Sequence, residues 1–591
     1  MKLKALVLMV FLLLLISFPS VVLAQSTATR VLVNSADWKD VYSGMLYANL
    51  NNYQGYFLTS TRHGTIILYS IPKGFEPVEI ISSRTNPFVL NYKSILENDG
   101  YRNVDELKVG NGNLELLELL PNINKFIVID SSYGYNSISV APYALLGKYY
   151  VLFADQRNIN QVIRAMDQRS PSEVIIYGQV ARQVKNALEK YNPITINTGD
   201  RFDNNIEIVK LYQQLHTKLT GQPRKQAILT NGEFIEDSVV AGKDPVLFIG
   251  YSNVPEHVRE YIKNSELQVG TLVGNELIGT ATFVRRQTGL SVFVKFGQGA
   301  RVPEGVVAQV EDLDRFPIPT YPLSLEIVTA SINTATNNLE ITYHNPGRIG
   351  AYFHPLLLSI TDEEKTVVIP DESPAEYIEA NSYKTTIHPL VDADSNRIEL
   401  VGDNITLEIN TIYGESPKSL EQTLQKILKV ERVSIFDEAE IEIIDVSYAR
   451  SGSKFLIQVK NIGKVDAYVT AEIHDLDVNG ELLIVGADGI VMIPVGKTTT
   501  IPIQTTMTEL DVPSNPQVKV KVIYGERENA LIKVKEGLYN FKYSAFDFTI
   551  VIVIVLIILL LVLILLKKKC KKCEHKNPIV RKYCKKCGEK F

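Results

Sequence analysis

The segment Phe126-Ile-Val-Ile-Asp130 is an apolar run of strand length that ends on a carboxylate, and it sets the pattern for the first half of the chain. Two more apolar runs follow, at residues 149–153 and 173–177. An amphipathic stretch comes after each of them, at residues 160–166 and 181–191. Short buried strands that alternate with amphipathic helices are typical of parallel α/β structure. The sequence therefore predicts an α/β unit over residues 122–221.

The same order of elements recurs on both sides of this unit. Downstream, apolar runs at 227–230 and 245–249 precede a helical stretch at 255–263. Upstream, residues 30–33 begin in the same way, with Ala36-Asp37-Trp38 in the loop, and the pattern then diverges. We therefore expect three tandem α/β repeats, over residues 25–121, 122–221 and 222–310.

One polar segment after the last strand of the middle repeat carries a family resemblance. It reads Gly199-Asp200-Arg201-Phe202-Asp203-Asn204-Asn205, and Arg84-Thr85-Asn86 looks like its remnant in the first repeat. The segment resembles the Gly-x-Asp-Arg-Tyr-x-Thr/Asn motif of the cell-wall-binding repeat type 2 family. That resemblance covers residues 30–301 and implies three Rossmann-like units around a pseudo-threefold axis. In the family, such units hold surface proteins non-covalently to anionic wall polymers.

Two roles are open for the residues of this segment. Gly199 permits a turn, Asn205 can cap the helix that follows, and an ion pair of Arg201 with Asp200 could bridge neighbouring repeats. Alternatively, Arg201 and Arg84 bind an anionic polymer. The candidates for ligand or inter-repeat contact are Arg84, Asn86, Asp200, Arg201 and Asn205.

After a Pro-rich linker over residues 311–322, the apolar pattern changes to a period of two, which predicts half-buried antiparallel strands. Three features occur twice, 111 to 116 residues apart: an alternating run, a turn after Asn345 or Asn461, and an Ile-Tyr-Gly-Glu segment. This indicates a duplicated β-sandwich, over residues 323–436 and 437–540. The Asn-x-Gly turn resembles the CARDB group of immunoglobulin-like domains, which serve as stalks in prokaryotic surface proteins.

The two ends of the chain predict a membrane topology. Residues 1–24 combine a basic start, a short apolar core and a small-residue site at Ala24, which is typical of a cleaved secretory signal peptide rather than an anchor. Residues 548–566 contain no charged residue. At about 1.5 Å per residue they can cross a hydrocarbon core of about 30 Å. Three lysines follow, so the positive-inside rule places the C-terminus in the cytoplasm. We expect a single-pass cell-membrane protein with its N-terminal ectodomain outside.

The formal charge of −5 is unevenly divided. Of 61 Lys and Arg residues, 11 follow residue 566 and two lie in the signal peptide. Of 66 Asp and Glu residues, two follow residue 566 and none lies in the signal peptide. The ectodomain therefore carries 48 basic and 64 acidic residues, a net charge of −16. That charge opposes binding of an anionic polymer unless a basic groove or divalent cations intervene, and binding of another envelope protein fits as well.

All four cysteines lie in the C-terminal segment 567–591, as two C-x2-C pairs: Cys570, Cys573, Cys584 and Cys587. Two such pairs supply the four sulfurs of a tetrahedral zinc site, and a segment this short folds only with its metal. A redox dithiol pair and palmitoylated thiols are the alternatives. The Tyr-Cys-Lys-Lys-Cys-Gly sequence resembles the second knuckle of the zinc-ribbon family, which implies a structural zinc. The ectodomain has no cysteine and hence no disulfide.

No catalytic motif is present, since G-x-S-x-G, H-E-x-x-H and the P-loop pattern are all missing from the sequence. Gly110-Asn-Gly112 and Gly297-Gln-Gly299 lack the rest of a dinucleotide fingerprint, and we expect them to be loop turns. The single N-glycosylation sequon begins at Asn404, on the exported side.

With 591 residues, 45% hydrophobic, the chain is a multidomain globular protein rather than a disordered, collagen-like or nucleic-acid-coating one. We predict a non-enzymatic surface or envelope protein whose head binds an envelope polymer or a surface-layer protein. The combination of repeats, stalk and ribbon resembles archaeal membrane proteins. The alternatives are a regulatory subunit of an envelope hydrolase and a receptor that signals through the ribbon to a cytosolic protein. No nucleic-acid partner is expected.

Overall fold

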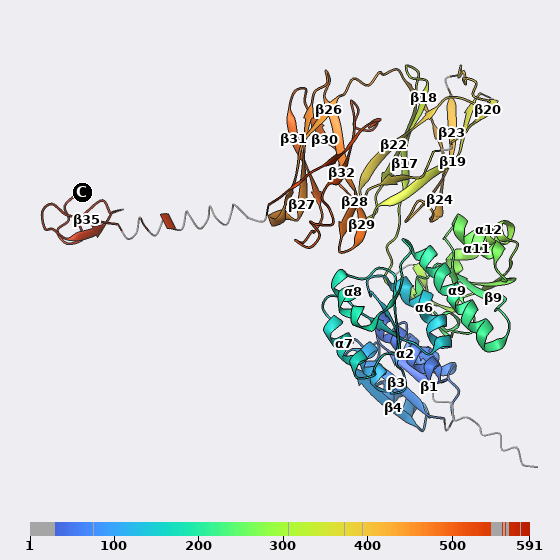
Figure 1. Ribbon diagram of the computed structural model, residues 1–591. Coiled ribbons are helices and arrows are strands. Elements are labelled where there is room, and N and C mark those ends of the chain that lie inside the picture. The colour runs from blue at the N-terminus through green and yellow to red at the C-terminus, as the bar shows by residue number, and fades with distance from the viewer. Residues whose placement is uncertain are drawn as a thin grey trace, which may run out of the picture. The chain divides into compact units, whose positions relative to one another are not determined.

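The computed structural model describes residues 30–544, without 75, 305, 306, 364, 372, 393 and 403, and in the tail residues 558, 559, 562 and 566–591, without 580. The described residues form two compact units (Figure 1). The first lies within 1–248 and 260–320, and the second within 249–259 and 321–591. The fold is thus multidomain, with α/β structure in the first unit and antiparallel β structure in the second.

The first unit contains three four-stranded parallel sheets with one topology. In each, the first strand lies between the second and the third, and the fourth is at the edge. The strands of the first sheet are β1 (Arg30–Asn34), β2 (Gln54–Phe57), β3 (Val78–Ser83) and β4 (Val104–Val109). The second has β5 (Lys125–Ile129), β6 (Tyr150–Phe153), β7 (Glu173–Tyr177) and β8 (Ile194–Ile196). The third has β9 (Gln226–Thr230), β11 (Val246–Phe248), β12 (Val269–Val273) and β13 (Ser291–Lys295).

Helices connect these strands in the same order in each repeat. The first repeat has α2 (Trp38–Leu50), α3 (His63–Ile66), α4 (Tyr92–Asn98) and α5 (Gly112–Glu118). The second has α6 (Gly134–Gly147), α7 (Ile159–Asp167), α8 (Arg182–Leu188) and α9 (Arg201–Thr220). The third has α10 (Asp237–Val240), α11 (Glu256–Asn264) and α12 (Ile278–Thr288). In the third repeat the hairpin β14 (Gly299–Glu304) and β15 (Val307–Asp312) follows the last strand, where α5 and α9 follow it in the others.

The apolar run that defines the middle repeat is the core of its sheet. Phe126, Ile127, Val128 and Ile129 are fully buried, because helices cover a parallel sheet on both faces. In α7 the buried residues Ile159, Val162 and Met166 recur at helical spacing, as the amphipathic pattern predicts.

The predicted linker 311–322 begins too early. Strand β16 (Phe316–Pro317) pairs with β10 (Phe234–Ile235), and the Phe316 ring lies 6.3 Å from the rings of Phe57 and Phe88. Proline is tolerated in a two-residue edge strand, so its presence there did not mark a hinge. The first unit continues to Thr320. Conversely, residues 249–259 belong to the second unit, where the Ser252 hydroxyl accepts a hydrogen bond from the Thr423 N–H at 2.9 Å.

The second unit contains two β-sandwiches of the same topology. The sheets of the first sandwich follow the orders β22-β18-β17-β25 and β20-β19-β23-β24, with β21 paired to β19. Its strands are β17 (Glu326–Asn333), β18 (Asn338–Asn345), β19 (Ala351–Asp362), β20 (Lys365–Ile369), β21 (Glu376–Ile378), β22 (Ser382–Pro389), β23 (Ile405–Gly414), β24 (Leu420–Lys429) and β25 (Glu431–Val433).

The sheets of the second sandwich follow the orders β31-β27-β26-β34 and β29-β28-β32-β33, with β30 paired to β28. Its strands are β26 (Ile441–Ala449), β27 (Lys454–Asn461), β28 (Ala467–Val478), β29 (Glu481–Gly486), β30 (Val491–Ile493), β31 (Thr498–Gln504), β32 (Val518–Gly525), β33 (Lys533–Tyr539) and β34 (Lys542–Ser544). Strand β34 pairs with β26, so this sandwich extends past the predicted boundary at residue 540.

The turn after each repeated asparagine has the same hydrogen bonds in both sandwiches. The Asn345 side chain accepts a bond from the Gly347 N–H at 2.9 Å and donates to the Ile349 carbonyl at 2.8 Å. Asn461 makes the equivalent bonds to Gly463 and Val465 at 2.9 and 2.8 Å. Both asparagines are fully buried, so this bonding explains why the pattern occurs twice.

A buried ion pair joins the two sandwiches. Glu340 on β18 is 2% exposed at its side chain, and its carboxylate accepts a hydrogen bond from the Arg527 guanidinium at 2.8 Å. Beside it, the Thr342 hydroxyl donates to the Asn529 carbonyl at 2.6 Å.

The predicted signal peptide, residues 1–24, lies outside the described residues, as does most of the predicted span 548–566. Within the described residues, no helix combines the length and the apolar character needed to cross a membrane. The tail folds around two short antiparallel strands, β35 (Lys567–Lys569) and β36 (Lys576–Pro578).

Candidate functional site

Buried asparagines join the three α/β repeats. Asn205, near the start of α9, is fully buried. Its side-chain amide donates to the Val246 carbonyl at 2.9 Å and accepts from the Phe248 N–H at 2.8 Å. Both partners lie on β11, the edge strand of the next repeat, so the side-chain amide pairs with that strand as a peptide group would. The second amide proton goes to the Ser139 hydroxyl on α6 at 2.7 Å.

Asn113 on α5 makes the same contacts between the first two repeats. It donates to the Val151 carbonyl at 2.9 Å and accepts from the Phe153 N–H at 3.1 Å, both on β6. The Ser43 hydroxyl on α2 takes the place of Ser139, at 3.0 Å. Sequence reasoning missed Asn113, although Asn113 and Asn205 both lie near the start of the helix that follows the fourth strand of a repeat.

The structure therefore changes the alignment of the repeats. Segment 84–86 follows the third strand, β3, whereas Gly199 follows the fourth strand, β8. The counterpart of the Gly199 segment in the first repeat is Gly110-Asn111-Gly112-Asn113, which was expected to be a loop turn. It opens helix α5, and the Asn111 side chain caps that helix by accepting from the Leu114 N–H.

The other candidates from this segment lie in different surroundings. Asp200, not Asn205, caps α9, since its carboxylate accepts from the N–H groups of Phe202 and Asp203 at 2.9 Å. Arg201 is 8% exposed, and its guanidinium carbon lies 4.8 Å from the centre of the Phe202 ring.

In the first repeat, Arg84 is exposed and forms an ion pair with Glu115 at 2.8 Å. Asn86 is exposed, and its carbonyl accepts from the Ala36 N–H at 2.9 Å. Of the candidate residues in the head, Asn205 forms side-chain hydrogen bonds to the neighbouring repeat, and Arg84 displays a cation at the surface.

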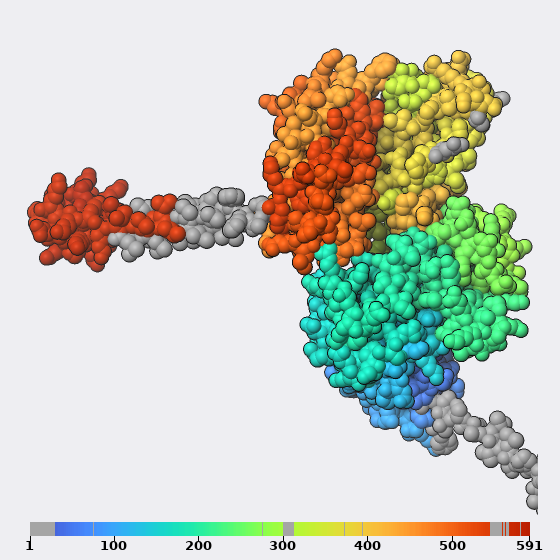
Figure 2. Space-filling view, viewed as in Figure 1, coloured from blue at the N-terminus to red at the C-terminus, as the bar shows by residue number. Residues whose placement is uncertain are grey.

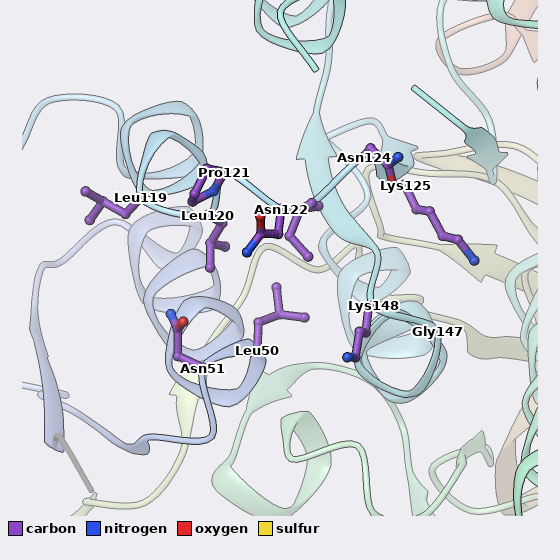
Figure 3. Close-up of a pocket in the computed structure, with 11 residues that line it drawn as sticks. Leu50, Asn51, Leu119, Leu120, Pro121, Asn122, Asn124, Lys125, Gly147 and Lys148 are labelled. Atoms are coloured by element: carbon purple, nitrogen blue, oxygen red, sulfur yellow. The ribbon is translucent and has the colours of Figure 1, made fainter. Parts of the chain in front are cut away.

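A cavity of about 480 Å³ lies between the first two repeats, where α2, α5 and α6 end (Figure 3). Its lining is Leu50, Asn51, Leu119, Leu120, Pro121, Asn122, Ile123, Asn124, Lys125, Gly147 and Lys148. The ionisable side chains among these lining residues are Lys125 and Lys148, with no carboxylate, histidine, cysteine or hydroxyl residue beside them.

The four cysteines of the tail form one cluster, named here the cysteine centre (Cys570, Cys573, Cys584 and Cys587). All four sulfurs lie within 4.8 Å of one another, and the Cys570–Cys587 and Cys573–Cys584 pairs are each 3.5 Å apart. A tetrahedral zinc site with Zn–S bonds of about 2.3 Å places its sulfurs about 3.8 Å apart. The spacing therefore fits a tetrahedral metal, whereas a disulfide needs about 2.05 Å, and all four thiols are free.

A buried amide supports the cysteine centre. Asn577 is fully buried, donates to the Cys584 sulfur at 3.4 Å and accepts from the Lys585 N–H at 2.8 Å. Desolvation raises the pKa of Cys584, but hydrogen bonds from the N–H groups of Cys587 and Lys586 and from the side chains of Asn577 and Cys573 together lower it, and the pKa falls to about 6. These contacts favour the thiolate, which is the form that binds a metal. His575 contributes its carbonyl, which accepts from the Cys570 N–H at 3.0 Å.

A buried histidine in the first sandwich was not anticipated. His388 on β22 lies 3.5 Å from the Asp371 carboxylate, and the two side chains are 5% and 8% exposed. Burial lowers the pKa of His388, and the neighbouring His354 acts in the same direction, while Asp371 opposes the shift. The cross-strand register that pairs Leu339 with His388 pairs Phe455 with Ile503 in the second sandwich. One copy of the duplicated core is thus polar where the other is apolar.

The glycosylation candidate Asn404 is exposed and immediately precedes β23.

No family model matches the chain. No curated protein matches it either.

Several solved structures are similar in part. Cwp8 from Clostridium difficile is 12% identical over 44% of this chain and 47% of its own, with a TM-score of 0.36. The chain thus spans about half the length of that protein. A protein of unknown function from Porphyromonas gingivalis W83 is 9% identical over 37% of this chain and 99% of its own, with a TM-score of 0.14. The CsuC–CsuE chaperone–tip adhesion subunit complex from Csu pili of Acinetobacter baumannii is 11% identical over 38% of this chain and 99% of its own, with a TM-score of 0.13. These similarities are too weak to support an inference about function, which must be argued from the residues of this chain.

Proposed function

We propose that this chain is a non-enzymatic protein of the cell surface or envelope, whose α/β head binds an envelope polymer or a surface-layer protein. The observation that carries the proposal is the way the head is built. Asn113 and Asn205 join three copies of one fold through buried hydrogen bonds to the next copy. Such an array offers an extended binding surface, and the resemblance of the Gly199 segment to wall-binding repeats supports that use.

The ends of the chain support a single-pass anchor. A signal peptide at 1–24 exports the ectodomain, residues 548–566 span the cell membrane, and the lysines that follow keep the tail in the cytoplasm. In the tail the cysteine centre holds a structural zinc ion, which supplies the free energy that folds a segment too small for a hydrophobic core. The close sulfurs and the Asn577 contact support this assignment.

The net charge of −16 on the ectodomain restricts the mode of binding. An anionic polymer would be held through divalent cations that bridge its anions to acidic side chains, or through displayed cations such as Arg84. A protein ligand needs neither. Removal of divalent cations therefore separates the two ligand classes.

The test is retention of envelope material by the full chain in detergent. Native envelope extract is passed over the immobilised protein with magnesium and calcium and then with EDTA, and the bound polymer and protein are quantified. Loss of retained polymer in EDTA supports cation-bridged binding, and protein retained under both conditions supports a surface-layer partner. Retention of nothing in either condition contradicts the proposal. Arg84→Gln, matched with Arg102→Gln at another exposed arginine, tests direct binding by Arg84.

A receptor function is the second candidate, and the folded cysteine centre favours it because an anchor alone needs no domain on the cytoplasmic side. A single helix transmits a signal chiefly through a change of oligomeric state. A chain that stays monomeric with and without bound envelope material would contradict this function. Loss of a cytosolic partner in Cys584→Ser, with surface anchoring retained, would support it.

A further inference from the structure

The tail ribbon, residues 567–591, carries an unusual density of positive charge. It contains 11 Lys and Arg residues and two Glu residues. Ten of the 11 basic residues are exposed. In the described part of the tail, one ion pair is formed, between Lys572 and Glu589 at 3.0 Å. Most of this charge is therefore not neutralised within the ribbon.

The fold gathers these charges. Each metal-binding knuckle has the sequence Cys-Lys-Lys-Cys, and the four sulfurs lie within 4.8 Å of one another. The four knuckle lysines, Lys571, Lys572, Lys585 and Lys586, are therefore held around one centre. The strand pairing sets Lys569 opposite Lys576 and adds two more cations to the same small body, drawn in red in Figure 2.

Apolar side chains accompany the cations. Phe591 is 40% exposed and Tyr583 is 57% exposed. The ammonium group of Lys568 lies 4.2 Å from the centre of the Phe591 ring. Aromatic rings among lysines are typical of groups that lie at the boundary between lipid headgroups and acyl chains.

We propose, building on the single-pass anchor of the proposed function, that the ribbon binds the anionic phospholipids of the cytoplasmic leaflet through its knuckle lysines. The apolar stretch ends at Leu566, one residue before Lys567, so the leaflet surface is always within reach at a high effective concentration. Phosphate headgroups complement a dense cluster of ammonium groups, and clusters of four to eight basic residues beside a span are typical of such binding. The metal keeps the four lysines together, so charge and fold act jointly.

The experiment uses the full chain reconstituted in nanodiscs of phosphatidylcholine, with or without about 30% phosphatidylglycerol. Lysines are acetylated briefly and their modification is measured by mass spectrometry. We expect the knuckle lysines to react roughly threefold or more slowly in the anionic discs, and the difference to disappear in 1 M salt. Lys535, exposed on β33 of the second sandwich, is the internal control and should react equally in both discs.

A charge variant separates the knuckle lysines from the rest. Changing Lys571, Lys572, Lys585 and Lys586 to Gln should abolish the protection of Lys569 and Lys576. The matched control changes four other exposed lysines of the second sandwich, Lys460, Lys464, Lys497 and Lys542, and should leave the protection of Lys569 and Lys576 intact. One zinc per chain in both variants shows that the ribbon has kept its fold, and protection that persists in the zinc-loaded knuckle variant counts against the proposal.

The remaining outcomes also discriminate. Incorporation into both discs with equal acetylation rates would overturn the lipid surface and leave the anchor standing. Exclusion of the chain from the discs would overturn the anchor and this inference together. Protection that appears only when an RNA oligonucleotide is added would replace lipid by nucleic acid as the ligand.

Discussion

The substitution Asn113→Ala tests how the α/β repeats are joined. It leaves the Val151 carbonyl and the Phe153 N–H on β6 without their partner. A buried group that loses its hydrogen bond costs about 1–3 kcal/mol, so the two together should lower the free energy of unfolding by about 2–6 kcal/mol. Asn113→Asp should not restore the lost stability, because a carboxylate can accept a hydrogen bond from the Phe153 N–H but cannot donate one to the Val151 carbonyl.

The chain reports on this junction through its single tryptophan. Trp38 on α2 packs against Phe153, with ring centres 5.1 Å apart, so its fluorescence follows the contact between the first two repeats. In urea titrations of the full chain, with a slope of about 2–3 kcal/mol per M, the midpoint of the Trp38 transition of Asn113→Ala should fall by about 0.7–3 M.

The control is Asn103→Ala, at an exposed asparagine of the same repeat, which should change the free energy by about 0.5 kcal/mol or less. If both variants shift the Trp38 transition equally, the two hydrogen bonds of Asn113 do not join the repeats and the reasoning is refuted.

Three further predictions concern the tail and the sandwiches. Asn577→Ala removes the buried donor to the Cys584 sulfur and should weaken zinc binding by about 10–100-fold in a competition titration with a chelating dye. The pKa of His388 is lower in the folded chain than in the unfolded chain, so the unfolded state takes up its proton first as the pH falls. Stability is therefore lost below about pH 6.5, and His388→Ile should flatten this loss in calorimetric scans between about pH 7 and pH 5. Arg527→Leu leaves Glu340 buried and unpaired, and calorimetry should show a loss of about 3–5 kcal/mol that Arg527→Leu with Glu340→Leu largely restores.

Each of these predictions has a contrary result. Unchanged zinc affinity in Asn577→Ala would mean that the amide only fills space. An acid sensitivity that survives in His388→Ile would move its origin to other buried groups. A double variant as unstable as Arg527→Leu alone would show that the desolvation of Glu340 is not what the arginine offsets.

The sequence anticipated the repeating architecture because burial leaves a local trace. The continuous apolar run at 126–129 marks a strand covered on both faces, and the alternation at 455–460 marks a strand with one solvated face. The cysteine centre could also be predicted from the sequence, since the two thiols of each pair lie only three residues apart and are brought together by local structure.

The contacts that the sequence did not reveal are long-range. Asn113 looks like a turn residue, and only the arrival of β6 beside α5 makes it a buried inter-repeat contact. His388 has the pattern of an ordinary residue of an alternating strand, and the sequence does not show that Asp371, which lies between β20 and β21, comes within 3.5 Å of it. The Pro-rich segment suggested a hinge, yet Phe316 is held by Phe57 and Phe88 from the other end of the unit.

By itself, the sequence determined the α/β and β-sandwich classes, the duplication and the clustering of four cysteines in the tail. These follow from periodicity and spacing, which short-range sterics and burial impose on neighbouring residues. Only the tertiary structure decided which polar residues join the repeats and where the first unit ends. It alone showed that one of two equivalent sandwich cores contains a histidine beside a carboxylate. Those outcomes depend on hydrogen bonds between residues far apart in the chain, because a buried polar group must find its partner wherever the fold brings one.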